Sequence, residues 1–228
     1  MWYSPFFYHA VKSASVIVGA RHAVPLPPCP CYNIHIIKWK GESVMPRVAI
    51  ILAEGFEELE ATAIIDVLRR GGIDVVSAGL KKGPVSSARN IKIIPDSVID
   101  DLNSDDFDML VLPGGQPGSD NLNADKRVGD LLRDFNDKGK VTGAICAAPY
   151  VLANAGVLEG KHATSYPSFK EKLGNVAYEE KTVVTDGNVM TSRGPGTAIC
   201  FGLAIVERFL GPEKAQQIKD EMLVNQDC

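Results

Sequence analysis

The chain has little of what marks membrane or nucleic-acid-binding proteins. No apolar run approaches the roughly 18 residues that a membrane-spanning helix needs, so we do not expect a membrane protein. The net charge is -4 and the pI is near 5.6. No run of Lys and Arg is interleaved with aromatic residues. A nucleic-acid backbone is therefore not an expected partner.

Cysteine and histidine are also scarce, with five and four residues among 228. The odd number of scattered cysteines predicts no disulfide framework, and no C-x-x-C pair stands with a second pair or with histidines, as a zinc site would need. We expect no metal and a reducing compartment. Cys200 lies in an apolar stretch and is predicted to be buried in a helix, whereas Cys228 is predicted to be an unattached terminal thiol.

The first 45 residues differ from the rest. They carry four basic residues against one acidic residue, a net charge of +3, which leaves -7 in residues 46–228 because the whole chain is -4. They contain "VPLPPCPCY", which no helix or central strand tolerates. We interpret residues 1–45 as an extension, disordered or added by an over-assigned start codon, and residues 46–228 as one domain. An organelle transit peptide is the alternative. The expected location is the cytoplasm, or the mitochondrion if the extension is a targeting segment.

From Arg47 onward, apolar runs of strand length alternate with segments of helical period. Strands are expected at 47–54, 73–80, 107–115 and 140–146, and helices at 56–72, 125–139, 147–156, 196–210 and 211–223. Hairpins are expected at 84–96 and, around Asp186-Gly187, at 181–192. Apolar strands joined through helices form a parallel sheet that is covered on both faces. The sequence therefore predicts an α/β fold with a mostly parallel sheet and helices on each side.

Three segments are expected to meet at one edge of this sheet. They are "LAEGFEELE", "VLPGG" and "GAICAAP", and each follows a predicted strand. Ligands of open parallel sheets bind at the carboxyl ends of the strands. The sequence therefore places a candidate site where these three segments converge.

Cys146 stands at the junction between a predicted strand and a predicted helix. This is the position of the nucleophile in a strand-to-helix elbow, where a sharp turn exposes the side chain beside unpaired amides. Those amides and the helix dipole favour a thiolate and predict a lowered thiol pKa. The alternative is a buried cysteine that serves as a small apolar side chain.

Pro113-Gly114-Gly115 ends the neighbouring predicted strand. Glycines at this place let the backbone approach a ligand and direct amides at developing negative charge, as in an oxyanion hole. The alternative is a plain turn.

Glu60 is the carboxylate of the first helix that is expected to be buried. Its neighbours at i-4 and i+4 are Phe56 and Ile64, so its carboxyl lies under apolar cover, whereas Glu58 is expected on the solvent side. A desolvated carboxyl holds its proton more tightly and can pass it to a thiolate or a substrate. The alternative is an ordinary surface carboxylate.

No histidine stands next to Cys146. A peptidase-type triad needs one to activate the thiol, yet residue 147 is Ala, and His162 is the only histidine after residue 45. We interpret His162 as structural. If Cys146 is reactive, Glu60 and the helix terminus must activate it.

The motifs "AEGFEELEA", "VLPGG", "AICAAP" and "TSRGPGT", in this order, resemble the Parkinson-disease protein deglycase (DJ-one) family of the ThiJ/PfpI superfamily. The resemblance extends over residues 46–225 and implies a flavodoxin-like α/β sandwich that forms a homodimer. It implies a reactive cysteine at Cys146 and a protonated glutamate at Glu60. It also implies oxyanion amides at Gly115 and Ala147, with Gly114 at the tight turn.

The resemblance also concerns the walls of the pocket. It implies that Arg89, Arg193 and Pro195 line the family's pocket across the dimer. Some members carry a histidine before the proline of the "T-x-x-P" stretch and use it in proton transfer, whereas here Tyr166 precedes Pro167. A phenol or a water molecule would then have to relay the proton.

The function implied by the resemblance is that of a thiol enzyme without a cofactor. It would act as a deglycase or glyoxalase on small aldehydes such as methylglyoxal and on glycated proteins, with nucleic acid at most a repair substrate. The alternative is a redox sensor or redox-regulated chaperone in which Cys146 is oxidised to a sulfinic acid. A third interpretation is a flavodoxin-like domain that binds a phosphate or nucleotide, but no Gly-rich phosphate loop follows the first strand.

Overall fold

The computed structural model describes residues 45–225 and 228. The predicted extension, residues 1–45, lies outside the described residues except for Met45, so its interpretation stays a prediction. Across the described part of the chain, no helix is long and apolar enough to cross a membrane.

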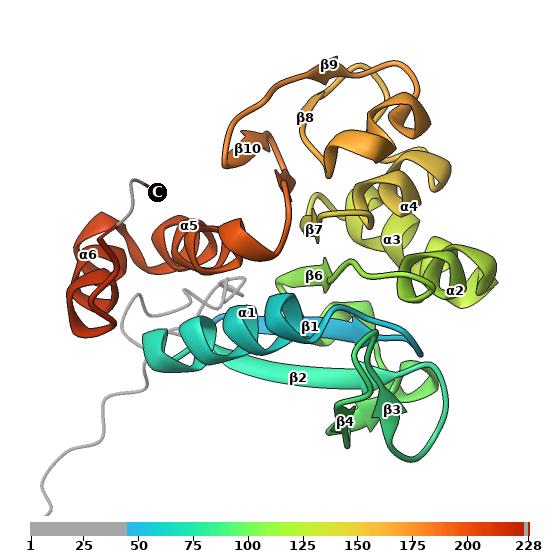
Figure 1. Cartoon of the computed structure of the whole chain (residues 1–228), viewed down its shortest axis with the longest axis horizontal. Coiled ribbons are helices and arrows are strands. Elements are labelled where there is room, and N and C mark those ends of the chain that lie inside the picture. Colours follow the sequence, from blue (N-terminus) through green and yellow to red (C-terminus); the bar gives the residue numbers. More distant parts are fainter. Residues whose placement is uncertain (1–44, 226–227) are drawn as a thin grey trace, which may run out of the picture. The chain divides into compact units, whose positions relative to one another are not determined.

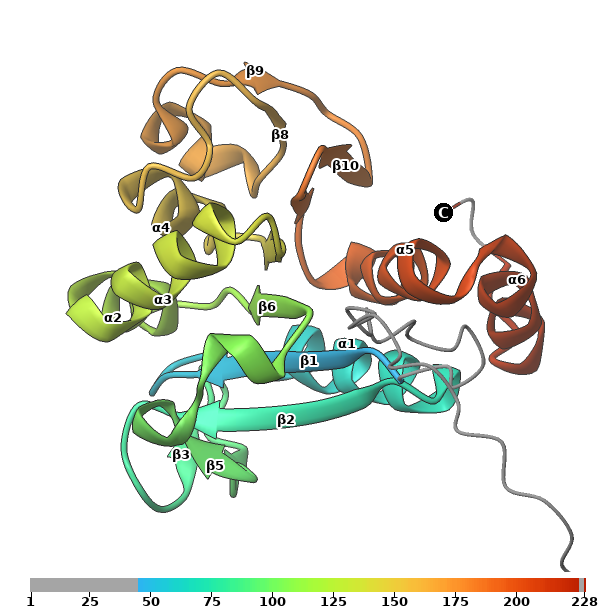
Figure 2. The same ribbon diagram turned by 180° about the vertical axis from the view of Figure 1, so that it is seen from behind.

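A seven-stranded sheet forms the centre of the fold (Figures 1 and 2). Its strands follow the order β10-β11-β7-β6-β1-β2-β5, and only the β10–β11 pair is antiparallel. Their bounds are β1 Arg47–Leu52, β2 Asp74–Gly79, β5 Ser97–Val98, β6 Met109–Leu112, β7 Val141–Ile145, β10 Val183–Asp186 and β11 Val189–Ser192. The predicted, mostly parallel sheet is therefore confirmed.

Helices cover both faces of the sheet (Figures 1 and 2). One face carries α1 (Glu58–Gly71), α5 (Ala198–Leu210) and α6 (Pro212–Glu221), and the other carries α2 (Gly118–Ala124), α3 (Lys126–Asp137) and α4 (Pro149–Asn154). Because successive side chains of a strand point to opposite faces, alternate residues of β1 enter separate apolar cores. Ile50 packs in the core of the first face, and Ala49 and Ile51 pack in that of the second.

Short elements complete the described chain. The predicted hairpin at 84–96 is present as β3 (Val85–Ser86) paired antiparallel with β4 (Lys92–Ile93). The strand expected at His162 is present as β8 (His162–Ala163), whereas the sequence did not indicate α2, β5, or β9 (Ala177–Tyr178), with which β8 pairs in parallel. Short 3-10 helices occupy Ile99–Asp101, Ser104–Asp106, Pro167–Leu173 and Pro195–Thr197.

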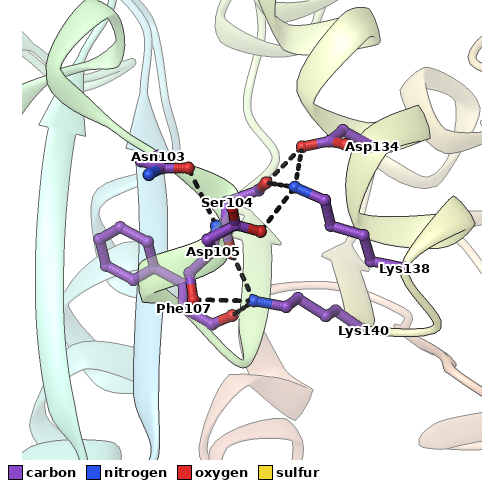
Figure 3. A network of polar contacts seen from close by, with 7 residues as sticks. All are labelled: Asn103, Ser104, Asp105, Phe107, Asp134, Lys138 and Lys140. Carbon is purple, nitrogen blue, oxygen red and sulfur yellow. Dashed lines mark hydrogen bonds and ion pairs between the residues drawn. The ribbon is translucent and has the colours of Figure 1, made fainter.

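A network of polar contacts ties the loop before β6 to the end of α3 and the start of β7 (Figure 3). The ammonium group of Lys140 donates to the backbone oxygens of Ser104, Asp105 and Phe107 at 2.6, 3.1 and 2.7 Å. The ammonium group of Lys138 donates to the Ser104 hydroxyl at 2.6 Å and to Asp105 at 2.7 Å. These bonds give donors to three backbone carbonyls of the loop before β6, and they tie that loop to the segment before β7.

Cys200 and Cys228 form a disulfide. Cys200 is buried in α5 as predicted, but the prediction of an unattached thiol at Cys228 and of no disulfide is wrong. The chain returns toward α5 after α6, and the two Cα atoms lie 4.9 Å apart, within the range that a disulfide spans. The sequence separation of 28 residues gives no sign of this return.

Candidate active site at the Cys146 elbow

Cys146 follows β7 directly and has a left-handed backbone, with φ of 63°. A residue with a Cβ adopts this conformation at a cost and mostly where its surroundings impose it. Here the Cys146 N–H donates to the Ser192 carbonyl at 3.0 Å, and the Cys146 carbonyl accepts from the Tyr166 N–H at 2.7 Å. Both backbone groups of the elbow are therefore tied to neighbouring segments, and the side chain is directed away from the strand.

The neighbouring turn after β6 requires glycine at two positions. A Cβ on Gly114 would lie 2.7 Å from the Cys146 Cβ, and a Cβ on Gly115 would lie 2.4 Å from the Glu57 backbone nitrogen. Gly115 also has φ of 92°, which favours glycine. The glycines thus allow the backbone of this turn to approach both the cysteine and the start of α1.

Two backbone amides lie near the sulfur. The N–H groups of Gly115 and Ala147 are close enough to the Cys146 thiol to lower its pKa. They come from different loops, after β6 and after β7. An oxygen that became negatively charged on a carbon bonded to this sulfur would lie near the same pair of donors, as in an oxyanion hole.

Glu60 is completely buried beside the cysteine, at 0% exposure. Its Oε2 accepts from the Gly114 N–H at 2.7 Å. Its Oε1 is buried with no hydrogen-bond partner among the described residues, and the Cys146 thiol is close enough to the carboxyl to lower its pKa. Burial raises the pKa of Glu60 from its ordinary 4.5 to about 7, although the Gly114 N–H lowers it.

The pKa of the Cys146 thiol is raised, not lowered as the sequence predicted. Burial is the largest cause, and the negative charge and the hydrogen bond of Glu60 raise this pKa further. The amides of Ala147 and Gly115 act in the opposite direction but do not outweigh burial. The helix α4 begins only at Pro149, so its positive end is not at the sulfur. The two groups are coupled, because a negative charge on the Glu60 carboxylate disfavours ionisation of the neighbouring thiol.

The remaining predicted site residues lie at different distances from the sulfur. Tyr166 is bonded to the Cys146 backbone, its side chain is 46% exposed, and a Cβ on Gly194 would lie 3.4 Å from its ring. Arg193 follows Ser192, the residue bonded to Cys146, but its guanidinium donates to the Glu180 carbonyl at 3.4 Å. The backbone of Arg193 therefore lies next to the residue that holds the elbow, whereas its guanidinium is bonded to the loop of Glu180.

Arg89 and Pro195 are not brought into contact with Cys146 by any bond within the described residues. The exposed Arg89 side chain donates to the adjacent Ala88 carbonyl at 3.4 Å. Pro195 begins a 3-10 helix and lines a hollow of about 400 Å³ together with Leu59. Their predicted roles depend on a second copy of the chain and stay predictions.

Two further predictions concern acidic and basic side chains. Glu58 is 9% exposed and its Oε2 is buried without a partner among the described residues, so the expectation of a solvent-exposed Glu58 is wrong.

The N–H of Ala88 donates to the Phe56 carbonyl, which places the loop of Ala88 against the start of α1. His162 lies in β8, and its Nδ1 is 2.6 Å from Glu179, so it does not contact the thiol.

Sequence reasoning missed two backbone elements of the site. The Ser192 carbonyl holds the elbow, and the Gly55 carbonyl accepts from the Gly118 N–H at 3.1 Å. Position at the carboxyl end of β11 was the available signal for Ser192, because the other site segments also follow the ends of strands. The Gly55 bond agrees with the predicted convergence of the segments after β1 and β6, although the bond itself was not predicted.

The fold and the site define a class of α/β sandwich proteins with a cysteine elbow beside a buried glutamate. The DJ-1/PfpI family profile matches residues 46–208, and the chain belongs to this family. It is 50% identical over 178 residues to Protein dj-1beta of Drosophila melanogaster, which covers 77% of this chain and 95% of that protein.

A solved structure and a second relative agree with this assignment. The crystal structure of Drosophila melanogaster DJ-1beta superposes with a TM-score of 0.77 at 48% identity, covering 80% of this chain and all of that chain. A Caenorhabditis elegans protein named glutathione-independent glyoxalase DJR-1.2 is 39% identical over 176 residues, 75% of this chain and 94% of its own length.

Proposed function

We propose that the protein is a cysteine-dependent glyoxalase and protein deglycase that needs no cofactor. The observation that carries the proposal is the arrangement of three groups: the Cys146 sulfur, the Glu60 carboxyl with a pKa of about 7, and the amides of Gly115 and Ala147 near the sulfur. The 39% identity to a protein named as a glyoxalase also supports it. The expected substrates are methylglyoxal, glyoxal and the early adducts that they form on proteins.

In the first step the sulfur adds to the aldehyde carbon of methylglyoxal. Glu60 accepts the thiol proton as the carbon–sulfur bond forms, and the Gly115 and Ala147 amides stabilise the resulting oxyanion. The raised thiol pKa is no obstacle, because the base lies against the thiol and the proton leaves during the addition. A carboxyl with a pKa near 7 is suited to accept and return protons at neutral pH.

In the second step the hemithioacetal rearranges to a thioester. A proton leaves the former aldehyde carbon and another is added to the neighbouring carbonyl carbon, which gives lactoyl-Cys146. Water then hydrolyses the thioester to lactate and restores the thiol, so the sum is methylglyoxal plus water giving lactate and a proton. Glu60 is the carboxyl placed to move these protons, and Tyr166 stands where some members of the family have a histidine.

Lactate formation tests the proposal directly. Full-length protein is mixed with methylglyoxal without glutathione, and lactate is followed by NMR beside the Cys146→Ser variant. We expect lactate from the parent and none above background from the variant. Tyr166→Phe is assayed in parallel, and a large fall in kcat would assign the relay to the phenol. No lactate from folded parent protein would refute the glyoxalase function.

A second candidate function is redox sensing, and one observation favours it. The Glu60 Oε1 is buried with no oxygen or nitrogen partner among the described residues, so a protonated Glu60 has a donor available for an oxygen on an oxidised Cys146 sulfur. The expected product with peroxide is a sulfinic acid. Intact-protein mass spectrometry would show a gain of two oxygens, lost in Cys146→Ser. Sulfinic acid formation without any lactate would favour the sensor over the enzyme.

A further inference from the structure

The Cys200–Cys228 disulfide lies in the wall of a groove of about 750 Å³ between β10, α5 and α6. Figure 1 shows α6 beside α5, and β10 is the edge strand of the sheet. The residues that line the groove include neither Cys146 nor Glu60. The chain therefore has a second sulfur site that the proposed enzyme does not use.

The two sulfurs of this site differ in accessibility. Cys200 is 1% exposed inside α5, whereas Cys228 is an exposed residue. The rate of thiol–disulfide exchange depends on which sulfur an attacking thiolate can reach. Attack is therefore expected at the Cys228 sulfur, with the Cys200 sulfur as the leaving group.

The lining of the groove carries both charges. Lys181, which precedes β10, and Lys219, on α6, line it together with Glu180 and Glu207. Lys181 is paired with Glu179 at 2.6 Å, while Lys219 makes no ion pair within the part of the chain that the structure describes.

Apolar side chains complete the lining. They include Val183, Leu203 and Ala215. A ligand that fits has carboxylates for the lysines, an ammonium group for the glutamates and a short uncharged body.

We propose that this groove binds a small zwitterionic peptide thiol of the glutathione class and exchanges it with the Cys200–Cys228 disulfide. Its thiolate attacks the Cys228 sulfur, a mixed disulfide forms there, and the Cys200–Cys228 bond breaks. The proton released by the incoming thiol ends on Cys200. A second molecule of the thiol then attacks the mixed disulfide, leaving Cys228 reduced and the small thiol as its own disulfide. No other oxidant or reductant is needed in either step.

The exchange would free the C-terminal residue from α5. Residues of the segment after α6, Met222 to Asn225, line the hollow of about 400 Å³ beside Leu59 and Ile199. The disulfide therefore attaches the chain after α6 to α5 through Cys228. The concentration of the small thiol would decide whether this attachment is present.

The test uses oxidised full-length protein with glutathione and, separately, with cysteamine, a cationic thiol without a carboxylate. Samples are alkylated at intervals, and peptide mass spectrometry measures the state of each cysteine. We expect a glutathione adduct on Cys228 and a free thiol on Cys200. Replacing both lysines, Lys181→Glu with Lys219→Glu, should slow exchange with glutathione roughly tenfold without slowing exchange with cysteamine.

Two further variants keep the test decisive. Gln216→Lys adds a positive charge to the groove lining and should speed exchange with glutathione, whereas Lys214→Glu, on α6 outside the lining, should change neither rate. The proposal is overturned if oxidised protein contains no Cys200–Cys228 peptide, if the adduct forms on Cys200, or if the charge changes affect both thiols equally. Cys228→Ser should leave lactate formation unchanged, so this inference and the proposed enzyme can fail separately.

Discussion

The Gly114 N–H donates a 2.7 Å hydrogen bond to Oε2 of Glu60, and this contact joins the loop after β6 to the first helix. A Cβ on Gly114 would lie 2.9 Å from the same oxygen. The glycine therefore supplies both the donor and the space that the carboxyl occupies. The position of Glu60 beside Cys146 therefore depends on glycine at residue 114, because a Cβ there would collide with both side chains.

Gly114→Ala is expected to reduce lactate formation strongly, by about 100-fold or more if the carboxyl moves by an ångström. The new methyl group would also meet the Cys146 Cβ at 2.7 Å. Initial rates with methylglyoxal measure the effect. The control is Gly129→Ala in α3, where the nearest atom to the new Cβ is 3.4 Å away and activity should be retained. Parent-like activity in Gly114→Ala would contradict the geometry argued above.

Glu60→Gln should change stability in a pH-dependent manner. The pKa of Glu60 is about 7 in the folded protein against 4.5 ordinarily, so between these values the folded chain holds a proton that the unfolded chain has lost. Stability therefore falls as pH rises through this window, by up to about 3 kcal/mol above pH 7. Glutamine does not titrate, so the variant should unfold at a higher temperature than the parent at pH 8 and at a similar temperature at pH 4.5. Thermal denaturation at both pH values measures this.

Catalysis should depend on the same ionisation. As the base, Glu60 acts in its ionised form, so kcat/KM for methylglyoxal should rise with pH up to a plateau above about 7. The rise should be absent from the residual activity of Glu60→Gln. A parent profile that falls across this range would argue that Glu60 acts as an acid in the step that limits the rate.

Lys140→Met should destabilise the fold by about 1–3 kcal/mol. The ammonium group of Lys140 donates to three backbone carbonyls (Figure 3), and methionine keeps the apolar stem but no donor. Chemical denaturation measures the free energy of unfolding. The control is Lys126→Met, because the Lys126 side chain is 84% exposed and, among the described residues, pairs only with Asp130, so its loss should cost less than about 0.5 kcal/mol. An equal loss of stability in Lys140→Met and Lys126→Met would show that the bonds of Lys140 to the three carbonyls do not stabilise the fold.

Leu59→Glu should weaken the homodimer that the family resemblance implies. Leu59 is 54% exposed on α1 and adjoins the apolar side chains of Ala63 and Ile199, and we propose that a second copy of the chain covers it. A buried, unpaired carboxylate at such a contact is costly. Light scattering after size-exclusion chromatography measures the mass, with Asn123→Asp on α2 as the control. An unchanged dimer in Leu59→Glu would place the interface elsewhere.

The sequence by itself determined the order of the main elements and the segments that form the site. Apolar runs and helical periods are local properties, so β1, α1, β6 and β7 could be assigned from them. The rule that ligands meet the carboxyl ends of parallel strands then predicted that the segments of Cys146, Glu60 and Gly115 would meet at one edge of the sheet.

Only the tertiary structure decided the electrostatics and the long-range contacts. The pKa of Cys146 is set by burial and by Glu60, which lies 86 residues earlier in the chain, and helix position alone predicted the wrong direction. The Cys200–Cys228 disulfide and the burial of Glu58 depend on how separate segments return to one another. Local sequence patterns do not indicate which distant segments come into contact, because desolvation and distance are properties of the packed chain.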